Sequence, residues 1–138
     1  MDNDVNLQEK YERILFMDFK LEIAGILAKC VDMDIEEIAN ILEVPPSADM
    51  GDYAFPCFKL SRALRMGPPQ IAATLAGAID AGDLCEAKQQ GGYLNFFLNR
   101  DNFAKKTLDN VLAAGEAYGA SDMGDGKTVC IDYSSINI

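Results

Sequence analysis

The sequence predicts an α+β domain in which helices pack on a small antiparallel sheet built from two hairpins, a two-layer arrangement. Several segments carry apolar residues at helical spacing, whereas residues 84–98 alternate around a Gly-Gly pair as a hairpin does. Hydrophobic residues make up 49% of the 138-residue chain, but no apolar run approaches the ~20 residues of a membrane helix. The expected order is two helices, two strands, two helices, two strands and a helix, after which one more strand begins.

The first helix is expected over residues 11–31, because six apolar residues fall on one stripe: Phe16, Phe19, Ile23, Ile26, Leu27 and Cys30. Residues 1–10 show no such pattern and are expected to be a loose, disordered extension. Asp34 and Glu37 have the spacing of a capping box, which predicts a short helix over residues 35–40.

Two short strands are expected next, over residues 41–44 and 53–57, and would form the first hairpin. Pro45-Pro46 ends the first of them, and Pro56 marks the second as an edge or a strand end. Helices are then expected over residues 58–66 and 68–80, the latter started by Pro68-Pro69, since proline suits the first helical turn.

The clearest hairpin joins residues 84–90 to residues 92–98, with Gly91-Gly92 supplying the positive φ angles of a tight turn. A last helix is expected over residues 101–114, with four apolar side chains turned inward: Phe103, Leu108, Val111 and Leu112.

Charge and cysteine content restrict the function. Residues 1–52 hold 13 acidic and 4 basic residues and residues 53–138 hold 9 and 8, so their nets of −9 and −1 give the −10 of the chain. A domain that bound nucleic acid through phosphates alone would be basic. The four cysteines are at positions 30, 57, 85 and 130 without a Cys-x-x-Cys pair, and there is no histidine. We therefore expect no metal site and no disulfide, and reduced thiols that act as small core residues.

The second strand of the clear hairpin has two different faces. Alternation places Leu94, Phe96 and Leu98 on the core side and Tyr93, Asn95 and Phe97 on the other. Aromatic rings beside an amide suit stacking on a base and hydrogen bonding to its edge. An ordinary strand with a half-covered outer face has the same pattern, so the residues alone leave both readings open.

The end of the chain looks unfinished. Residues 128–133 read as a buried strand that leads into Ser134-Ser135-Ile136-Asn137, whereas domains normally end in polar tails. We expect a fragment, with a first domain over residues 1–118, a Gly-rich linker over 119–126 and the start of a second domain over 127–138. The polar, acidic N-terminus is not typical of a secretory or transit signal, so a cytoplasmic protein is expected.

Four segments together resemble one family. The stretches 51–56 (Gly-Asp-Tyr-Ala-Phe-Pro), 67–72 (Gly-Pro-Pro-Gln-Ile-Ala) and 92–98 (Gly-Tyr-Leu-Asn-Phe-Phe-Leu) resemble the N-terminal additional domain of arginyl-tRNA synthetase. Residues 129–138 look like the strand that opens the Rossmann-like class I catalytic domain of that family, cut short here. The resemblance covers residues 17 to 138.

The resemblance implies that the domain contacts the D-loop, at the outer corner of tRNA. Its contacts would come from Gln90, Tyr93 and Asn95, with Tyr93 stacking on an extruded base and the two amides reading the base edge. Lys59, Arg62 and Arg65 are candidate phosphate contacts on charge alone, and a solvated helix face is the alternative for them.

For the intact enzyme, the resemblance implies an arginine–tRNA ligase that uses ATP with magnesium. Asp132, Ser135 and Asn137 would hold the arginine backbone, although the family usually has Glu at 132 and Pro at 136, where this chain has Asp and Ile. No catalytic residue and no cofactor are expected within the chain itself, which is predicted to be inactive alone and monomeric.

Two other hypotheses remain open at this point. One is a free-standing acidic α+β interaction domain without RNA binding, and the other is a piece of a different α+β protein that shares the hairpin by chance.

Overall fold

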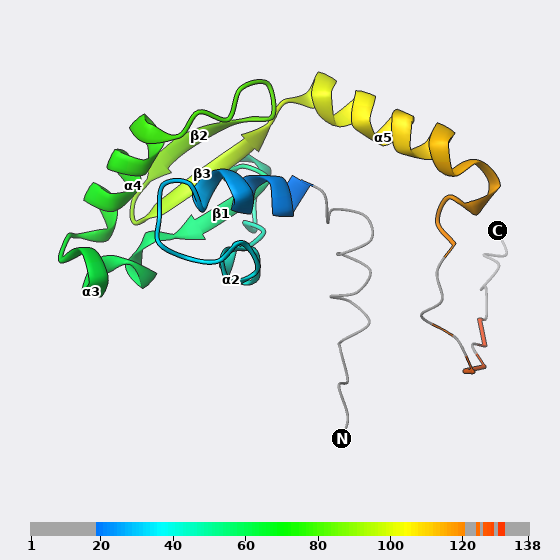
Figure 1. Ribbon diagram of the computed structural model, residues 1–138, viewed down its shortest axis with the longest axis horizontal. Helices are drawn as coiled ribbons and strands as arrows, with labels where there is room; N and C mark the ends of the chain where they lie inside the picture. Colours follow the sequence, from blue (N-terminus) through cyan, green and yellow to red (C-terminus); the bar gives the residue numbers. More distant parts are fainter. Residues whose placement is uncertain (1–18, 121–123, 125, 129, 132–138) are drawn as a thin grey trace, which may run out of the picture. The chain divides into compact units, whose positions relative to one another are not determined.

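The structure is a computed structural model that describes residues 19–120, 124, 126–128, 130 and 131 (Figure 1). The chain divides into two compact units, residues 1–103 and 104–138, and each is described separately. Among the described residues, no helix has the length and apolar content needed to cross a membrane.

A three-stranded antiparallel sheet forms the centre of the first unit. Its strands are β1 (Tyr53–Pro56), β2 (Cys85–Gln90) and β3 (Tyr93–Leu98), arranged in the order β1-β3-β2. The predicted hairpin is therefore confirmed as β2 and β3. Its turn differs in one respect, because Gly91 has a positive φ of 58° but Gly92 does not.

The two-hairpin prediction is wrong in its first half, as far as the described residues extend. The helix α2 (Ile35–Ile41) continues into the expected strand, which leaves an isolated antiparallel bridge between Glu43 and Ala54. Their backbone N–H groups each donate to the other's carbonyl at 2.9 Å. Pro45-Pro46 follows at once and has no N–H to extend the ladder, so a single bridge is all that forms.

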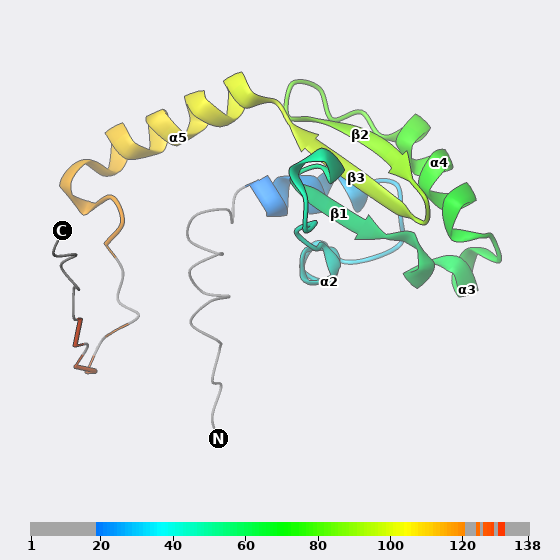
Figure 2. The same cartoon turned by 180° about the vertical axis from the view of Figure 1, so that it is seen from behind.

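Helical residues 19–27 lie across one face of the sheet, in front of it in Figure 1 and behind it in Figure 2. The predicted stripe is confirmed at Phe19, Ile23 and Leu27, which are buried, whereas Cys30 is exposed because the helix ends at Leu27. Phe16 lies outside the described residues. In α2, Asp34 is the N-cap, but its side chain makes no capping hydrogen bond, so the expected capping box does not form.

The segment after β1 is not the single helix that was expected. It consists of the 3-10 turn η2 (Cys57–Lys59) and the one-turn helix α3 (Ser61–Leu64), which Arg65 ends in the left-handed conformation. The next helix, α4 (Pro68–Ala78), begins at its two prolines as predicted and buries Ile71, Ala72 and Leu75.

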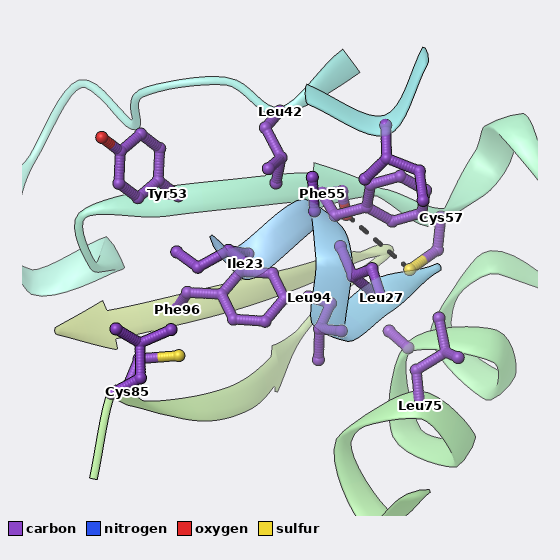
Figure 3. Close-up of a cluster of buried hydrophobic side chains, with 14 of the residues drawn as sticks. Ile23, Leu27, Leu42, Tyr53, Phe55, Cys57, Leu75, Cys85, Leu94 and Phe96 are labelled. Carbon is purple, nitrogen blue, oxygen red and sulfur yellow. Dashed lines mark hydrogen bonds between the residues drawn. The ribbon is translucent and has the colours of Figure 1, made fainter. Parts of the chain in front are cut away.

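The core lies between the sheet and these helices (Figure 3). Its central side chains, from helix 19–27, β1 and β3, are fully buried: Ile23, Leu27, Phe55, Leu94 and Phe96. The prediction of which β3 residues face the core is thus confirmed. Cys57 and Cys85 also belong to this core, as expected for small apolar thiols, whereas Cys130, like Cys30, is exposed.

The helix α5 (Arg100–Ala114) begins where Asn99 caps it. The Asn99 side chain accepts hydrogen bonds from the backbone N–H groups of Asp101 and Asn102 at 3.0 and 3.1 Å. Of the four side chains expected to face inward, Phe103 packs against the core, and its ring lies 5.2 Å from that of Phe19. Leu108 and Leu112 are 60% and 78% exposed, so that part of the prediction is wrong.

The expected strand over residues 128–133 is described in part. Thr128, Cys130 and Ile131 have no regular secondary structure, and the rest of that segment lies outside the described residues.

Gly51 and Asp52 attach the start of β1 to β3. Gly51 has a φ of 95°, and a Cβ there would lie 2.7 Å from the carbonyl oxygen of Phe96. The Asp52 carboxylate accepts hydrogen bonds from the backbone N–H of Leu98 at 2.8 Å and from Arg100 at 2.9 Å. These contacts explain why glycine and aspartate occur together ahead of this strand.

The Gly51 contact predicts a large effect of one methyl group. We expect Gly51→Ala to lower the free energy of unfolding by more than about 1 kcal/mol, because the backbone must leave its positive φ and retreat from Phe96. Gly77→Ala is the matched control. It lies in α4 with no atom within 4 Å of the added Cβ, and we expect it to be neutral or to stabilise by up to about 1 kcal/mol. Urea unfolding measures both, and equal effects would contradict the steric argument.

The buried thiols predict a loss of stability at alkaline pH. Burial raises the pKa of Cys57 from 9.0 to about 11, and burial together with the nearby Asp52 and Glu22 carboxylates raises that of Cys85 equally. The native state therefore holds these protons longer than the unfolded chain does. The resulting stabilisation is complete below pH 9 and is lost as the pH rises through about 11.

Urea titrations between pH 8 and pH 11 test this expectation. The Cys57→Ala/Cys85→Ala variant, whose other titrating groups are unchanged, should lose less stability over that range than the parent chain. In the parent chain at pH 8, iodoacetamide should label Cys30 well before Cys57 or Cys85. If the free energy of unfolding fell with pH equally steeply in variant and parent, these thiols would not contribute to the loss of stability.

Candidate RNA-binding hairpin

The outer face of the sheet, opposite the helical residues 19–27, carries the predicted functional residues. Because directly paired residues in an antiparallel sheet point to the same side, three pairs share this face: Gln90 with Tyr93, Lys88 with Asn95 and Glu86 with Phe97. The strands that carry them face the viewer in Figure 2. The structure thus brings Gln90, Tyr93 and Asn95 together at the turn end of the hairpin.

Tyr93 is the exposed aromatic of this group, at 37% of its surface. The ring of Phe58, from η2, meets it edge to face with 5.8 Å between centroids and 85° between planes. This geometry is a preferred one for aromatic pairs, because a positive ring edge meets a negative ring face. Phe58 therefore supports Tyr93 from one side, while Tyr93 stays accessible to solvent.

Asn95 differs from the expectation that it lies open to solvent. It is on the predicted face but only 4% exposed, opposite the small, buried Ala54 of β1. Its amide nitrogen donates to the Gln90 side-chain oxygen at 2.7 Å. Its own oxygen is buried and has no hydrogen-bond partner among the described residues.

Lys88 neutralises the charge of Glu86, the acidic residue on this face of the hairpin. Its ammonium group lies 2.9 Å from the Glu86 carboxylate and 4.9 Å from the centre of the Phe97 ring. Both the ion pair and the cation–π contact direct Lys88 along β2, away from the turn. On this face, the polar side-chain groups that remain near the turn are the amides of Gln90 and Asn95 and the Tyr93 hydroxyl.

The hairpin turn is held between two other segments. The backbone N–H of Cys57 donates to the Gly92 carbonyl at 3.0 Å, and a Cβ on Gly92 would lie 3.0 Å from the Cβ of Pro68. Glycine at 92 therefore lets the start of α4 approach the turn closely. This contact fixes where Tyr93 emerges from the sheet.

The basic candidates do not form one helical face. Lys59 belongs to η2, Arg62 to α3 and Arg65 to the left-handed end of α3, so the break between η2 and α3 separates them. All three are exposed. The arginine-binding candidates Asp132, Ser135 and Asn137 lie outside the described residues. Within the described part of the chain, no cluster of three or more acidic or cysteine side chains could hold a metal ion.

Sequence reasoning missed Phe58 and the burial of Asn95. Phe58 was placed in a helix, and its contact with Tyr93 depends on the link between Cys57 and Gly92, which no local pattern reveals. The burial of Asn95 follows from the pairing of β1 with β3, which alternation within one strand cannot predict. A small Ala54 between large β1 residues was the available signal.

Comparison with known proteins agrees with this arrangement. A family model described as the arginyl tRNA synthetase N terminal domain matches residues 17–98, which include all three strands. The arginine–tRNA ligase of Clostridium botulinum is 47% identical over 122 residues, which are 88% of this chain and 22% of that protein. The corresponding ligase of Clostridioides difficile is 48% identical over 123 residues, with the same coverage.

A solved structure is also similar. The structure of Thermus thermophilus arginyl-tRNA synthetase matches this chain with a TM-score of 0.51 and 29% sequence identity. The match covers 67% of this chain and 15% of the Thermus chain. The chain spans about a fifth of the length of the curated relatives it matches. On the family model that covers more than half of its residues, this chain belongs to the arginyl-tRNA synthetase N-terminal domain family.

Proposed function

We propose that this domain binds tRNA at the D-loop through the β2–β3 hairpin, as part of an arginine–tRNA ligase. The observation that carries the proposal is the exposed Tyr93 ring, supported edge-on by Phe58 beside two linked amides. A base taken out of its stack could lie on such a ring and present its edge to the amides. The proposal draws support from the ligase relatives, all of which act on tRNA according to their names.

The chemistry of the ligase would reside outside the hairpin. Arginine would be activated with ATP and then joined to its tRNA, with Asp132, Ser135 and Asn137 near the arginine backbone, as the family resemblance implies. We propose the cytoplasm as the site of this reaction. The domain would contribute tRNA binding and no catalytic group.

An acidic interaction domain without RNA binding is the second candidate, favoured by the net charge of −10. The two functions differ in what the outer face does. For an RNA-binding hairpin, Tyr93 has to remain exposed to receive a base, whereas a protein partner could use any part of the acidic surface.

Removing the Tyr93 ring tests the proposal. We expect Tyr93→Ala to weaken tRNA binding by ~1–3 kcal/mol, about five- to 150-fold, because the stacking surface is lost. Tyr93→Phe is the matched control and should keep most of the affinity, since the ring remains. Fluorescence anisotropy with labelled arginine tRNA measures both variants in the intact ligase, where the rest of the enzyme also contributes affinity, and circular dichroism checks the fold. A folded Tyr93→Ala protein with unchanged affinity would favour the interaction domain.

Binding by this chain alone is expected to be weak. One stacked base contributes ~1–3 kcal/mol, whereas micromolar affinity needs about 8 kcal/mol. The net charge of −10 also opposes approach to a polyanion. We expect a dissociation constant no better than the high micromolar range at physiological salt. A fluorescence titration measures this constant, and nanomolar binding would contradict the expectation.

A further inference from the structure

We propose that residues 57–68, which we call the cationic loop, bind RNA phosphates beside the base that stacks on Tyr93. The contacting side chains are Lys59, Arg62 and Arg65, and Arg65 occupies a backbone position that favours glycine because its side chain is needed for this contact. The inference rests on the proposed function and adds a second surface to it, one that holds the RNA backbone and reads no base.

The cationic loop is a basic region in an acidic chain. Between Asp52 and Asp80 the sequence contains three basic residues and no acidic one, whereas the other nine of the 12 basic residues are outnumbered by 22 acidic ones. All three cations of the loop are exposed, and none forms an ion pair with a described residue. Lys88, Arg100 and Lys105, by contrast, are each paired with a carboxylate. Three unpaired positive charges on one short loop suit the phosphates of a nucleic acid.

Both ends of the cationic loop are held at the hairpin turn, next to Tyr93. At its start, the backbone N–H of Cys57 donates to the Gly92 carbonyl at 3.0 Å. At its end, Pro68 lies so near Gly92 that an added Cβ would be 3.0 Å from the Cβ of the proline. The ring of Phe58, also in the loop, contacts the Tyr93 ring, and Figures 1 and 2 both show α3 at this end of the sheet. An RNA strand whose base lies on Tyr93 therefore has its phosphates close to the loop.

Core packing does not account for the outer part of the cationic loop. Cys57 and Leu60 anchor the loop in the core, but the four-residue helix α3 buries no side chain, and Leu64 and Met66 are 49% and 38% exposed. Most helices in proteins are stabilised by packing an apolar face, which α3 does not do. This part of the loop therefore presents side chains to solvent and does not fill the core.

Arg65 has a backbone conformation that lowers stability. Its φ of 51° and ψ of 37° are left-handed, and no other non-glycine residue in the described part of the chain has a positive φ. In this conformation the Cβ crowds the following carbonyl oxygen, so helices that end in this way usually have glycine there. A strained residue of this kind indicates that its side chain has a function, and the fork of N–H donors on a guanidinium suits a phosphate.

The variant Arg65→Gly separates binding from folding, because the two should change in opposite directions. Glycine adopts the left-handed conformation without strain, so we expect the melting temperature of the chain to rise by at least about 2 °C. In the intact ligase, we expect weaker binding of an arginine tRNA transcript. A plot of log affinity against log salt concentration should become shallower by about 0.7 to 0.9, the contribution of one phosphate contact.

The other two cations are tested in the same assay. Lys59→Gln and Arg62→Gln should each reduce the salt slope by a similar amount, with little change in melting temperature, since both side chains are exposed. Lys105→Gln is the matched control. It removes an exposed positive charge that is paired with Asp109 at 2.6 Å on α5, and should leave the slope unchanged. Because phosphate contacts carry no base information, each loss of affinity should be equal for transcripts with a replaced D-loop base.

The outcomes distinguish this inference from the proposed function. A melting temperature that falls in Arg65→Gly together with the affinity would show a structural role for Arg65 and overturn the inference. Unchanged salt slopes in all three variants would overturn it as well, and the RNA-binding hairpin would stand if Tyr93→Ala still weakened binding. If Tyr93→Ala also left binding unchanged, both would be overturned.

Discussion

The register of β3 between its two neighbours is the constraint on which the rest of the domain depends. Side chains alternate along this central strand, so Leu94, Phe96 and Leu98 fill the core while Tyr93 and Asn95 lie on the outer face. A slip of one residue would exchange the two sets and put an amide in the core. Gly51 and Asp52 oppose that slip, because both contact β3 backbone atoms at fixed positions, Phe96 and Leu98. Core packing and the composition of the outer face are therefore set by the same few backbone contacts.

The three sequence segments that carry the family resemblance in the first unit meet at the turn of the hairpin. The first supplies the strand β1, whose last residue, Pro56, pairs with Tyr93. The second begins at Gly67 and brings Pro68 against Gly92, the first residue of the third segment. Gly51 and Gly92 thus permit close approaches, Pro56 ends a strand, and Pro68 begins a helix. The need to hold the exposed Tyr93 ring in one position explains why these segments, far apart in the chain, contain glycine and proline at these positions.

Much of the fold could be predicted from local pattern. The hairpin, the start of α4 at two prolines and the buried face of β3 depend on alternation and on backbone chemistry that a few neighbouring residues determine. Predictions failed where tertiary contacts decide the outcome. Apolar spacing in α5 suggested a buried stripe, yet Leu108 and Leu112 are exposed, because spacing alone does not supply a surface to pack against. The hydrogen bond between Asn95 and Gln90 could not be foreseen. It depends on the pairing of β1 with β3, which buries Asn95, and on the hairpin turn, which brings Gln90 next to it.

The two edge strands of the sheet have features that oppose aggregation at high concentration. β1 is four residues long, is bridged on its free side at Ala54 and ends at Pro56, which cannot donate a hydrogen bond to another strand. The opposite edge, β2, carries Glu86 and Lys88, charged side chains of the kind that oppose pairing with a strand of another molecule. β1 therefore offers no long run of free backbone groups to a neighbouring molecule. A domain that must keep an aromatic ring on its surface is thereby protected from adding strands to its sheet, the usual first step toward aggregates.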